Sequence, residues 1–507
     1  MKIPYVVAFA LFFSTVLQAQ DAGIRISSGL TAGNYMRPYR TDLSLSSDSS
    51  TTPLLRVPGD TVQYNMYGNL RDDNPAYNQK SSLPWVIGKV FVGNTVTWAA
   101  DRYIFNDDWA RIGFNSWSSN VKQGFEWDTD RFGMNFFAHP YSGAGYFNSA
   151  RDAGYNIYES IPFAVGGSLM WEYFGENSRP SYNDIVNTPV TGILLGEISY
   201  RLSSNFLDDR TSGFDRLSRE LFAGIINPWR GISRILNGKA WRTTAEEVYQ
   251  KEPFNLTFTT GARLTNDGSA FGTGTVGGLL ALHLDYGNPF ERRTRKPFDY
   301  FRLHAELALG GVAGRKIVSQ VLAYGMWYGK NIQLGKSDML IGVFQHYDFW
   351  DNWTYELGTI AFGPSIIAKT GFSDNVALHY DAHVGMIPLG GLSTILGPDN
   401  SQFRDYNYGA GLEGKGTVTL NLGSWVGITV RGYYYWIHTY VGRAGNAFVG
   451  IVKPSVSFRI LNNFSLGVEQ QIYYSDRYPR DFPNVHEVRT EQKVFLQLYI
   501  DNFKQER

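Results

Sequence analysis

Residues 493–501 read KVFLQLYID and alternate between strongly apolar positions and more polar ones. In an extended strand successive side chains point to opposite faces, so a period of two divides this segment into two distinct faces. The apolar face consists of Val494, Leu496, Leu498 and Ile500. The opposite face consists of Lys493, Phe495, Gln497 and Tyr499. The segment is predicted to be a β-strand with one face in an apolar environment.

The same alternation recurs upstream, for example in residues 302–309, 426–431 and 464–471. We count about twelve such segments from residue 254 onward, each of roughly the nine to eleven residues that a tilted membrane strand requires. Aromatic clusters lie near the predicted strand ends, in YGMWYG (324–329), FWDNWTY (349–355) and GYYYWIHTY (432–440). This is where the two interfaces of a bilayer favour aromatic rings.

A sheet with one apolar face must either cover that face with protein or expose it to lipid. Too little sequence remains to cover all of the predicted strands, and only a closed barrel leaves no unpaired edge in lipid. We therefore expect residues 246–507 to form an antiparallel outer-membrane β-barrel of about twelve strands. A water-soluble sandwich or barrel remains the alternative.

The N-terminus has the organisation of a secretory signal peptide. Lys2 precedes an apolar stretch over residues 3–17, and the small residue Ala19 precedes Gln20. The apolar stretch is short for a membrane span, so we expect cleavage after Ala19 or Gln20, with an uncleaved anchor as the alternative. Residues 21–82 are rich in Ser, Thr, Asp, Asn and Gly and are predicted to form a flexible arm.

The composition is consistent with an exported barrel. Lysine plus arginine and aspartate plus glutamate number 46 each, so no net charge favours nucleic acid as a partner. Aromatic residues make up 15% of the chain, with 54 glycines and no cysteine. These proportions suit a sheet with aromatic rims and exclude disulfides.

Residues 83–245 show helical spacing instead. Val86 and Val90 begin a helical pattern, and Ser181, with Asp184 three residues later, is predicted to cap a helix that extends to about Phe206. The apolar run at residues 161–171 is too short to cross a bilayer and is predicted to be a buried helix.

Several long motifs in this helical region resemble a bacterial outer-membrane family, domain of unknown function 3943. They are EWDTDRFGMNFFAHPYSGAGYFNSARDAG, SLMWEYFGENSRPSYNDIVNTPVTGILLGEISYRLS and the run from REL to INPWRGISRILNG, in this order. The resemblance implies an exported protein of the Gram-negative envelope with a helical motif region followed by a β-barrel. It assigns no activity to any residue.

His139 is the candidate centre of any chemistry in the helical region. It precedes Pro140, and the acidic residues Asp128, Glu172 and Asp184 lie on or beside neighbouring predicted helices. A histidine facing several carboxylates fits either a general base or a metal site with oxygen ligands. A buried polar network is the structural alternative. No HExxH, GxSxG or P-loop motif is present, so we assign neither a metal nor a cofactor from sequence.

Two further sets of polar residues are predicted to meet. The first set, on the predicted helices, is expected to contact either a ligand or the barrel wall and comprises Arg151, Glu176, Glu197, Arg201, Arg230 and Arg234. The second set is expected to point into the barrel lumen by strand alternation and comprises His283, Asp285, His304, Glu306, His379, Asp381 and His383.

The sequence thus predicts an α+β membrane protein in which an N-terminal α-helical domain plugs or caps the barrel from the periplasmic side. The function that follows is non-enzymatic, either envelope structure or the passage of a small or lipidic ligand. The alternative is an envelope-associated hydrolase with a His/carboxylate site in the helices. The expected partners are outer-membrane lipid and a small-molecule or lipid ligand.

Overall fold

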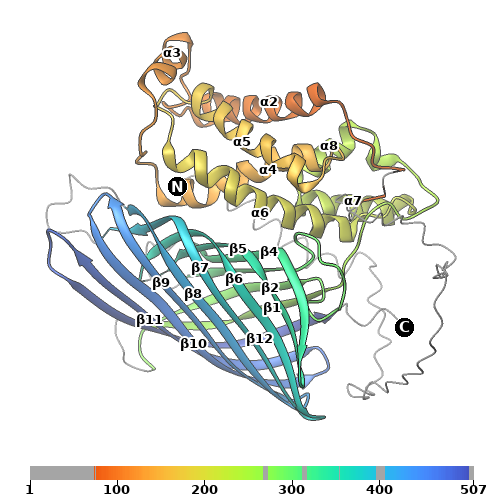
Figure 1. The fold of residues 1–507 in the computed structure, drawn as a ribbon, viewed down its shortest axis with the longest axis vertical. Helices are drawn as coiled ribbons and strands as arrows, with labels where there is room; N and C mark the ends of the chain where they lie inside the picture. The colour runs from red at the N-terminus through yellow and green to blue at the C-terminus, as the bar shows by residue number, and fades with distance from the viewer. Residues whose placement is uncertain are drawn as a thin grey trace, which may run out of the picture.

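The protein was analysed as a computed structural model, which describes residues 73–74, 76–266, 272–310, 317–352, 354–394 and 406–501. The predicted signal peptide and residues 21–72 of the predicted arm lie outside this part of the chain. Helices come first and strands follow, and Figure 1 shows them as two adjoining bodies. The helical segments are α2 (Leu83–Ala99), η1 (Ala100–Phe105), α3 (Phe114–Gln123), η2 (Met134–Ala138), α4 (His139–Arg151), α5 (Ile157–Phe174), α6 (Tyr182–Phe206), α7 (Gly213–Ile226), α8 (Pro228–Leu236) and η3 (Lys239–Trp241).

The described strands form one closed antiparallel barrel in which β1 pairs with β12. The expected fold class is thereby confirmed, including the number of strands. The strands are β1 (Phe254–Asn266), β2 (Thr275–Tyr286), β3 (Phe301–Leu309), β4 (Val318–Leu334), β5 (Ser337–Asp351), β6 (Glu356–Ser373), β7 (Val376–Ser393), β8 (Tyr406–Leu422), β9 (Val426–Val441), β10 (Gly445–Leu461), β11 (Phe464–Pro479) and β12 (Val485–Asp501).

Most strands are longer than the nine to eleven residues predicted. β4 and β12 have 17 residues each, and β6 has 18. At about 3.3 Å per residue and a tilt near 45°, 17 residues rise about 40 Å along the barrel axis. This distance spans the headgroup regions as well as the hydrocarbon core, whereas the prediction considered the core alone.

Side chains alternate between the lumen and the outside around the whole barrel. His283 lies opposite His304, and Asp285 lies opposite Arg302, with these polar side chains on the lumen side. The outward residues of β12, among them Val494 and Leu496, are exposed. A closed antiparallel barrel with a polar lumen and an apolar outside is the fold of outer-membrane proteins.

The residues around α2 to η3, which we call the helical layer (residues 83–241), pack against the outside of the barrel wall. α6 contacts β4, β5, β6 and β7 and is the long helix nearest the barrel in Figure 1. The barrel side chains at this contact occupy the alternate positions of their strands that face away from the lumen. They include Val321, Ala323, Tyr347, Phe349, Ile360, Leu389, Tyr406 and Tyr408, which belong to the same buried cluster as Phe132, Phe136 and Leu194 of the helical layer.

Hydrogen bonds and close packing fix this contact. Gln345 Nε2 donates to the carbonyl oxygen of Val190 at 2.8 Å, and the Tyr347 hydroxyl donates to the carbonyl oxygen of Phe136. Phe136 itself presses on Gly358, where an added Cβ would lie 2.2 Å from the phenylalanine ring. Any side chain at that position would therefore push the helical layer away from the wall.

This arrangement differs from the plug or cap expected from sequence. The lumen cavity described below is lined by barrel residues, whereas the helical layer faces outward parity positions of β2 to β8. The reason is that the outer wall over these strands offers rings such as Tyr347 and Phe349, which pack against helices as readily as against lipid. Strand alternation predicted that these residues face outward, but not whether helices or lipid would contact them.

Side chains of the barrel itself fill one end of the lumen. Odd-numbered strands run away from the end at which β1 begins and β12 ends. At the far end, a buried cluster that we call the lumen core is formed by Leu322, Trp350, Tyr355, Leu357, Ala361, Ile387, Leu392, Tyr435, Ile437, Ala447, Val449, Ile451 and Tyr473. Twelve strands enclose enough space for a channel, so this packing closes what would otherwise be an open end.

The helical layer has a polar interior and an apolar outer surface. In α8, Arg230, Ser233 and Arg234 are buried, whereas Ile232 and Ile235 are each 56% exposed. α7 repeats this arrangement, with Arg216 buried and its outer apolar side chains exposed. A helix in water normally buries its apolar stripe, so this polarity suits a helix whose outer face meets lipid. In the described part of the chain, no helix has both the length and the apolar character that crossing a membrane requires.

We expect the outer face of the helical layer to contact lipid. The chain contains no cysteine, so Phe91→Cys on α2 and Ile235→Cys on α8 each provide one labelling site. Nitroxide labels at both sites should be more accessible to oxygen than to a water-soluble nickel relaxant in proteoliposomes. Asp481→Cys, at an exposed loop position, is the aqueous control. Water-like accessibility at Phe91 and Ile235 would contradict the lipid contact.

Candidate functional site

Three helices meet tightly at the centre of the helical layer. α4 and α6 pack against each other at Gly143 and Gly192, where a Cβ added to Gly143 would lie 1.9 Å from the carbonyl oxygen of Thr188. α5 begins with Asn156 and Glu159 in a capping box, and α6 begins with Ser181 as its N-cap, as the sequence predicted. These bonds fix the starts of α5 and α6, whereas α4 follows directly from η2 without a side-chain cap.

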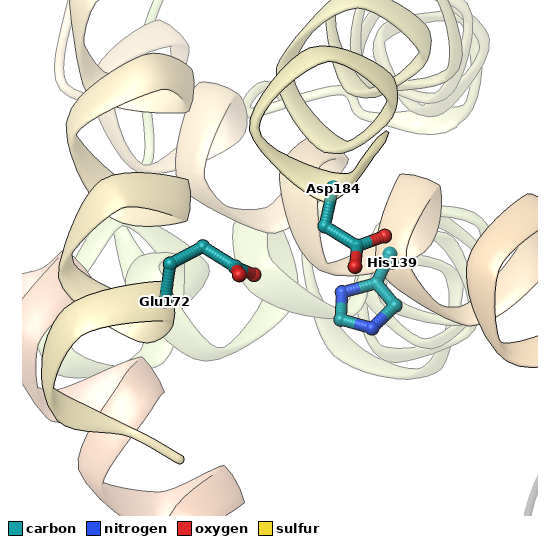
Figure 2. A group of neighbouring side chains, drawn as sticks. All are labelled: His139, Glu172 and Asp184. Atoms are coloured by element: carbon teal, nitrogen blue, oxygen red, sulfur yellow. The ribbon is translucent and has the colours of Figure 1, made fainter. Parts of the chain in front are cut away.

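His139, Glu172 and Asp184 converge at this centre from three different helices. His139 is the first residue of α4, Glu172 lies near the end of α5, and Asp184 lies in the first turn of α6. One nitrogen or oxygen atom from each lies within 4.8 Å of the others. Figure 2 shows the Asp184 carboxylate beside the imidazole, with Glu172 directed toward both from α5. The structure therefore brings together three of the four residues proposed for chemistry.

The fourth residue, Asp128, lies beside this group and is held by hydrogen bonds. Its Oδ2 accepts from Ser181 Oγ at 2.9 Å and from Asn183 Nδ2 at 2.8 Å. Its Oδ1 accepts from Asn135 Nδ2 at 2.7 Å. The Ser181 backbone N–H, in turn, donates to Glu172 Oε2 at 2.7 Å. Asp128 and Ser181 thus support the geometry of the three converging residues.

The electrostatics of this site are dominated by negative charge. Burial raises the pKa of the Glu172 carboxyl well above its usual range, and the nearby Glu176 carboxylate raises it further. Burial also raises the pKa of Asp184, with an added contribution from the charge of Asp128. No lysine or arginine forms an ion pair with these carboxyl groups in the described residues. Without a cation, buried carboxyl groups in such surroundings retain protons.

The pKa of Asp128 shifts in the opposite direction, because hydrogen bonds outweigh burial. Desolvation alone would raise its pKa, but hydrogen bonding with Asp184, Asn183 and Asn135 lowers it to about 2. Asp128 therefore carries a full negative charge at neutral pH, directly beside two carboxyl groups whose pKa values are raised.

The charged residues expected to meet a ligand or the barrel lie inside the helical layer. Arg151 and Arg201 both bind Glu197, at 2.7 Å and 2.8 Å. Arg201 also donates to the carbonyl oxygen of Pro297, just before β3, at 2.9 Å. The remaining members bond within or near the layer: Arg230 to Asp73 and Tyr200, Arg234 to Asp209 and Glu220, and Glu176 to Trp171. Asp73, which sequence placed in the flexible arm, is thereby tied to α6 and α8.

A second group of polar residues lines a cavity of about 330 Å³ in the lumen. We call this cavity the polar chamber. His283, His304, Glu306, Asp381 and His383 of the predicted lumen set line it. Asp285 and His379 line an adjoining hollow of about 420 Å³ together with Asp381. The chamber lies toward the end at which β1 begins, since Thr257, Gln497 and Tyr499 are also part of its wall.

Most chamber charges are paired, either between neighbouring strands or across the lumen. Lys493 Nζ lies 2.7 Å from Glu306 Oε2, and Arg302 bridges Asp285 at 2.6 Å and Asp381 at 2.8 Å. These basic partners were not among the residues singled out from the sequence. Alternation alone assigns Lys493 and Arg302 to the polar faces of their strands, but the partners that they meet depend on strand register.

Lys453 differs from the other chamber cations. Its side chain is 4% exposed, and Nζ donates to Gln320 Oε1 at 3.0 Å, but no carboxylate of the described residues pairs with it. It lies over the ring of Trp350 at 4.8 Å and directly opposite Arg431 on β9. Arg431 is itself paired with Glu469 at 3.5 Å, so Lys453 is the cation of this corner that has no carboxylate within ion-pair distance in the described residues.

The Glu197 interaction can be tested by a substitution that preserves shape. Glu197→Gln leaves Arg151 and Arg201 buried without their counter-charge, which costs about 3–5 kcal/mol in comparable buried pairs. The helical signal at 222 nm should therefore be lost at a clearly lower temperature than in the unmodified protein.

The control is Asp215→Asn, because Asp215 pairs with Arg219 while 55% exposed. Such a surface pair contributes about 0–1 kcal/mol. Equal melting temperatures for the Glu197 and Asp215 variants would show that the buried network does not stabilise the helical layer.

Comparison with known proteins supports the resemblance deduced from the motifs. The family model of domain of unknown function 3943 matches residues 124–229, from the segment before η2 to the start of α8. No curated protein is detectably similar to the chain.

Solved outer-membrane structures show a weak likeness to the chain. The NanC porin is 11% identical, with 48% of this chain and 98% of that chain covered and a TM-score of 0.28. An outer membrane channel from Pseudomonas putida F1 is 6% identical, with coverages of 49% and 95% and a TM-score of 0.28. The TodX monoaromatic hydrocarbon channel is 10% identical, with coverages of 50% and 90% and a TM-score of 0.20. The chain combines a closed antiparallel β-barrel of the outer-membrane type with a helical layer that carries domain of unknown function 3943 over residues 124–229.

Proposed function

We propose that the barrel binds a small organic anion in its polar chamber and that the lumen core keeps the route beyond the chamber closed. The observation that carries this proposal is Lys453, a buried cation with no carboxylate within ion-pair distance in the described residues; Arg431, opposite it on the neighbouring strand, is paired with Glu469. A bound carboxylate or phosphate would supply the missing negative charge.

The size and walls of the chamber support a small ligand. A volume of about 330 Å³ corresponds to roughly ten water molecules. The ring of Tyr433 lies on the same wall, 5.7 Å from Lys453 Nζ, and Trp350 lies beneath that amine. Aromatic rings beside a cation suit an anion with an apolar carbon skeleton better than a hydrated inorganic ion.

Closure of the far end rests on a bonded aromatic group as well as on apolar packing. Trp350 Nε1 donates to the Tyr435 hydroxyl at 3.0 Å, and that hydroxyl donates to Asp348 Oδ2 at 2.8 Å. Lys415 also bonds to Asp348. Trp350 and Tyr435 belong to the lumen core, whereas Asp348 and Lys415 line the chamber, so passage from the chamber would require this group to move. The helical layer has no plugging role in this proposal, because it contacts the outer wall.

The residues that the alternative hydrolase would use lie together around His139. A nucleophile activated by His139 would need a hydroxyl within hydrogen-bond reach of the imidazole. The described residues show no hydrogen bond between a serine or threonine hydroxyl and His139. Anion binding in the lumen is therefore the function that we favour.

Anion binding should depend on Lys453. In detergent, the folded protein should bind succinate by isothermal titration calorimetry, whereas Lys453→Met should bind at least about tenfold more weakly after loss of one charged hydrogen bond. Lys336→Met, in the short turn between β4 and β5, is the matched control and should bind like the unmodified protein. Unchanged succinate affinity in Lys453→Met would refute the proposed site, provided that heat-modifiable gel mobility shows a folded barrel.

Closure makes a separate prediction for conductance. In planar bilayers the unmodified protein should show little steady current, whereas combined Trp350→Ala and Tyr435→Ala substitutions should produce stable open steps, because two large side chains are removed from the lumen. Trp425→Ala, at an exposed position near the start of β9, controls for the loss of an aromatic residue. A large steady current through the unmodified barrel would contradict the closed lumen.

A further inference from the structure

The helical layer contains a second site that the proposed lumen function does not use. Its members are His139, Glu172 and Asp184, with Asp128 beside them. Glu172 and Asp184 are each 2% exposed, and His139 is half-buried. Several carboxyl groups thus share a small buried volume with one imidazole, which is an unfavourable arrangement unless positive charge is added.

One atom of this group has an unmet bonding requirement. The Asp184 carboxyl group shares a hydrogen bond with Asp128, but its buried Oδ1 accepts no hydrogen bond from an N–H or O–H group of the described residues. Its carboxylate points toward His139 in Figure 2 and takes part in the 4.8 Å convergence. A buried carboxylate oxygen without a donor costs roughly 1–3 kcal/mol, so its retention calls for a ligand that bonds to it.

The surroundings hold the three side chains as a site for a ligand requires. The second oxygen of Glu172 accepts from the Ser181 backbone N–H, and Ser181 Oγ donates to Asp128. Asp128 also accepts from Asn183 and Asn135. Hydrogen bonds of this kind orient the side chains that would contact a ligand and reduce the reorganisation that binding requires.

The donor set selects a class of cation. One imidazole nitrogen with two or three carboxylate oxygens suits Zn²⁺, Mn²⁺ or Fe²⁺, whereas Ca²⁺ prefers oxygen ligands only. The number of protein ligands matches zinc, which binds three or four protein groups, including mixed His and carboxylate sets. A shift of each side chain by about an ångström would shorten the present separations to those of a metal's ligands, which lie about 2 Å from zinc.

We propose that His139, Glu172 and Asp184 bind a divalent transition-metal ion, best matched by Zn²⁺, with Asp128 as a positioning residue or fourth ligand. The ion neutralises the buried carboxylates and joins the starts of α4 and α6 to the end of α5. The site is independent of the polar chamber, because the two share no residue.

The test uses full-length protein in detergent after removal of bound metal with EDTA. Titration with ZnCl₂ should show one strong site per chain, and a Co²⁺ complex should give the visible absorption of a nitrogen–oxygen ligand set. His139→Ala and Asp184→Asn should each abolish strong zinc binding. Asp128→Asn should weaken it by about 10–100-fold, as loss of an outer bond does. Asp215→Asn, on exposed α7, should bind zinc as the unmodified protein does.

Folding must be separated from binding. Each variant should retain heat-modifiable mobility, and metal-free Asp184→Asn should melt no lower than the metal-free unmodified protein, since a neutral amide there replaces a carboxyl group that is already protonated without the metal. A purely structural network predicts the reverse, a lower melting temperature in Asp184→Asn. Lys453→Met should keep its zinc site, so failure of the lumen proposal and failure of the metal proposal give different results.

Three outcomes would overturn the proposal. They are no metal binding by the folded, stripped protein; zinc binding that persists in both His139→Ala and Asp184→Asn; and binding of Ca²⁺ in preference to Zn²⁺.

Discussion

The pairing of β1 with β12 is the constraint on which the rest of the molecule depends. In lipid, each backbone amide and carbonyl needs a partner within the protein, and closure supplies partners for both edges of the sheet. Once the sheet is closed, the parity of each residue decides whether it faces the lumen or the outside. The charged chamber, the lumen core and the outer wall that receives the helices all follow from this parity.

As a consequence, the barrel and the helical layer each enclose charged side chains beneath an apolar outer surface. Inside the barrel, ion pairs such as Lys493 with Glu306 are shielded from lipid by the sheet. Outside it, the helical layer repeats the arrangement on a smaller scale, since Arg151, Glu197 and Arg201 are enclosed between helices whose outer faces are apolar. Buried charge is stable in both places because partners are fixed by rigid secondary structure.

Alternation in segments such as residues 493–501 predicted the barrel and its strand number well, because a membrane strand encodes its two faces locally. The helix that starts after Ser181 was equally readable from its cap. The position of the helices on the outer wall of the barrel could not be predicted from the sequence. The apolar stripe of α8 shows that Ile232 and Ile235 share a face, but not whether that face meets protein, lipid or the barrel.

The candidate site was predictable in part for a related reason. His139 and the acidic residues stand out by residue type, and the predicted cap at Ser181 suggested where Asp184 lies. Their convergence depends on the close packing of α4 on α6 at Gly143 and Gly192, which is a tertiary contact. Likewise, the lack of an acidic partner for Lys453 depends on the register that sets Arg431 opposite it.

The placement of the helical layer also fixes an order of assembly. The helices precede the strands in the chain, yet the surface on which Phe136 and Leu194 rest is built from β4 to β8 and exists only after those strands have paired. The first part of the chain to be made is therefore the last to reach its final packing.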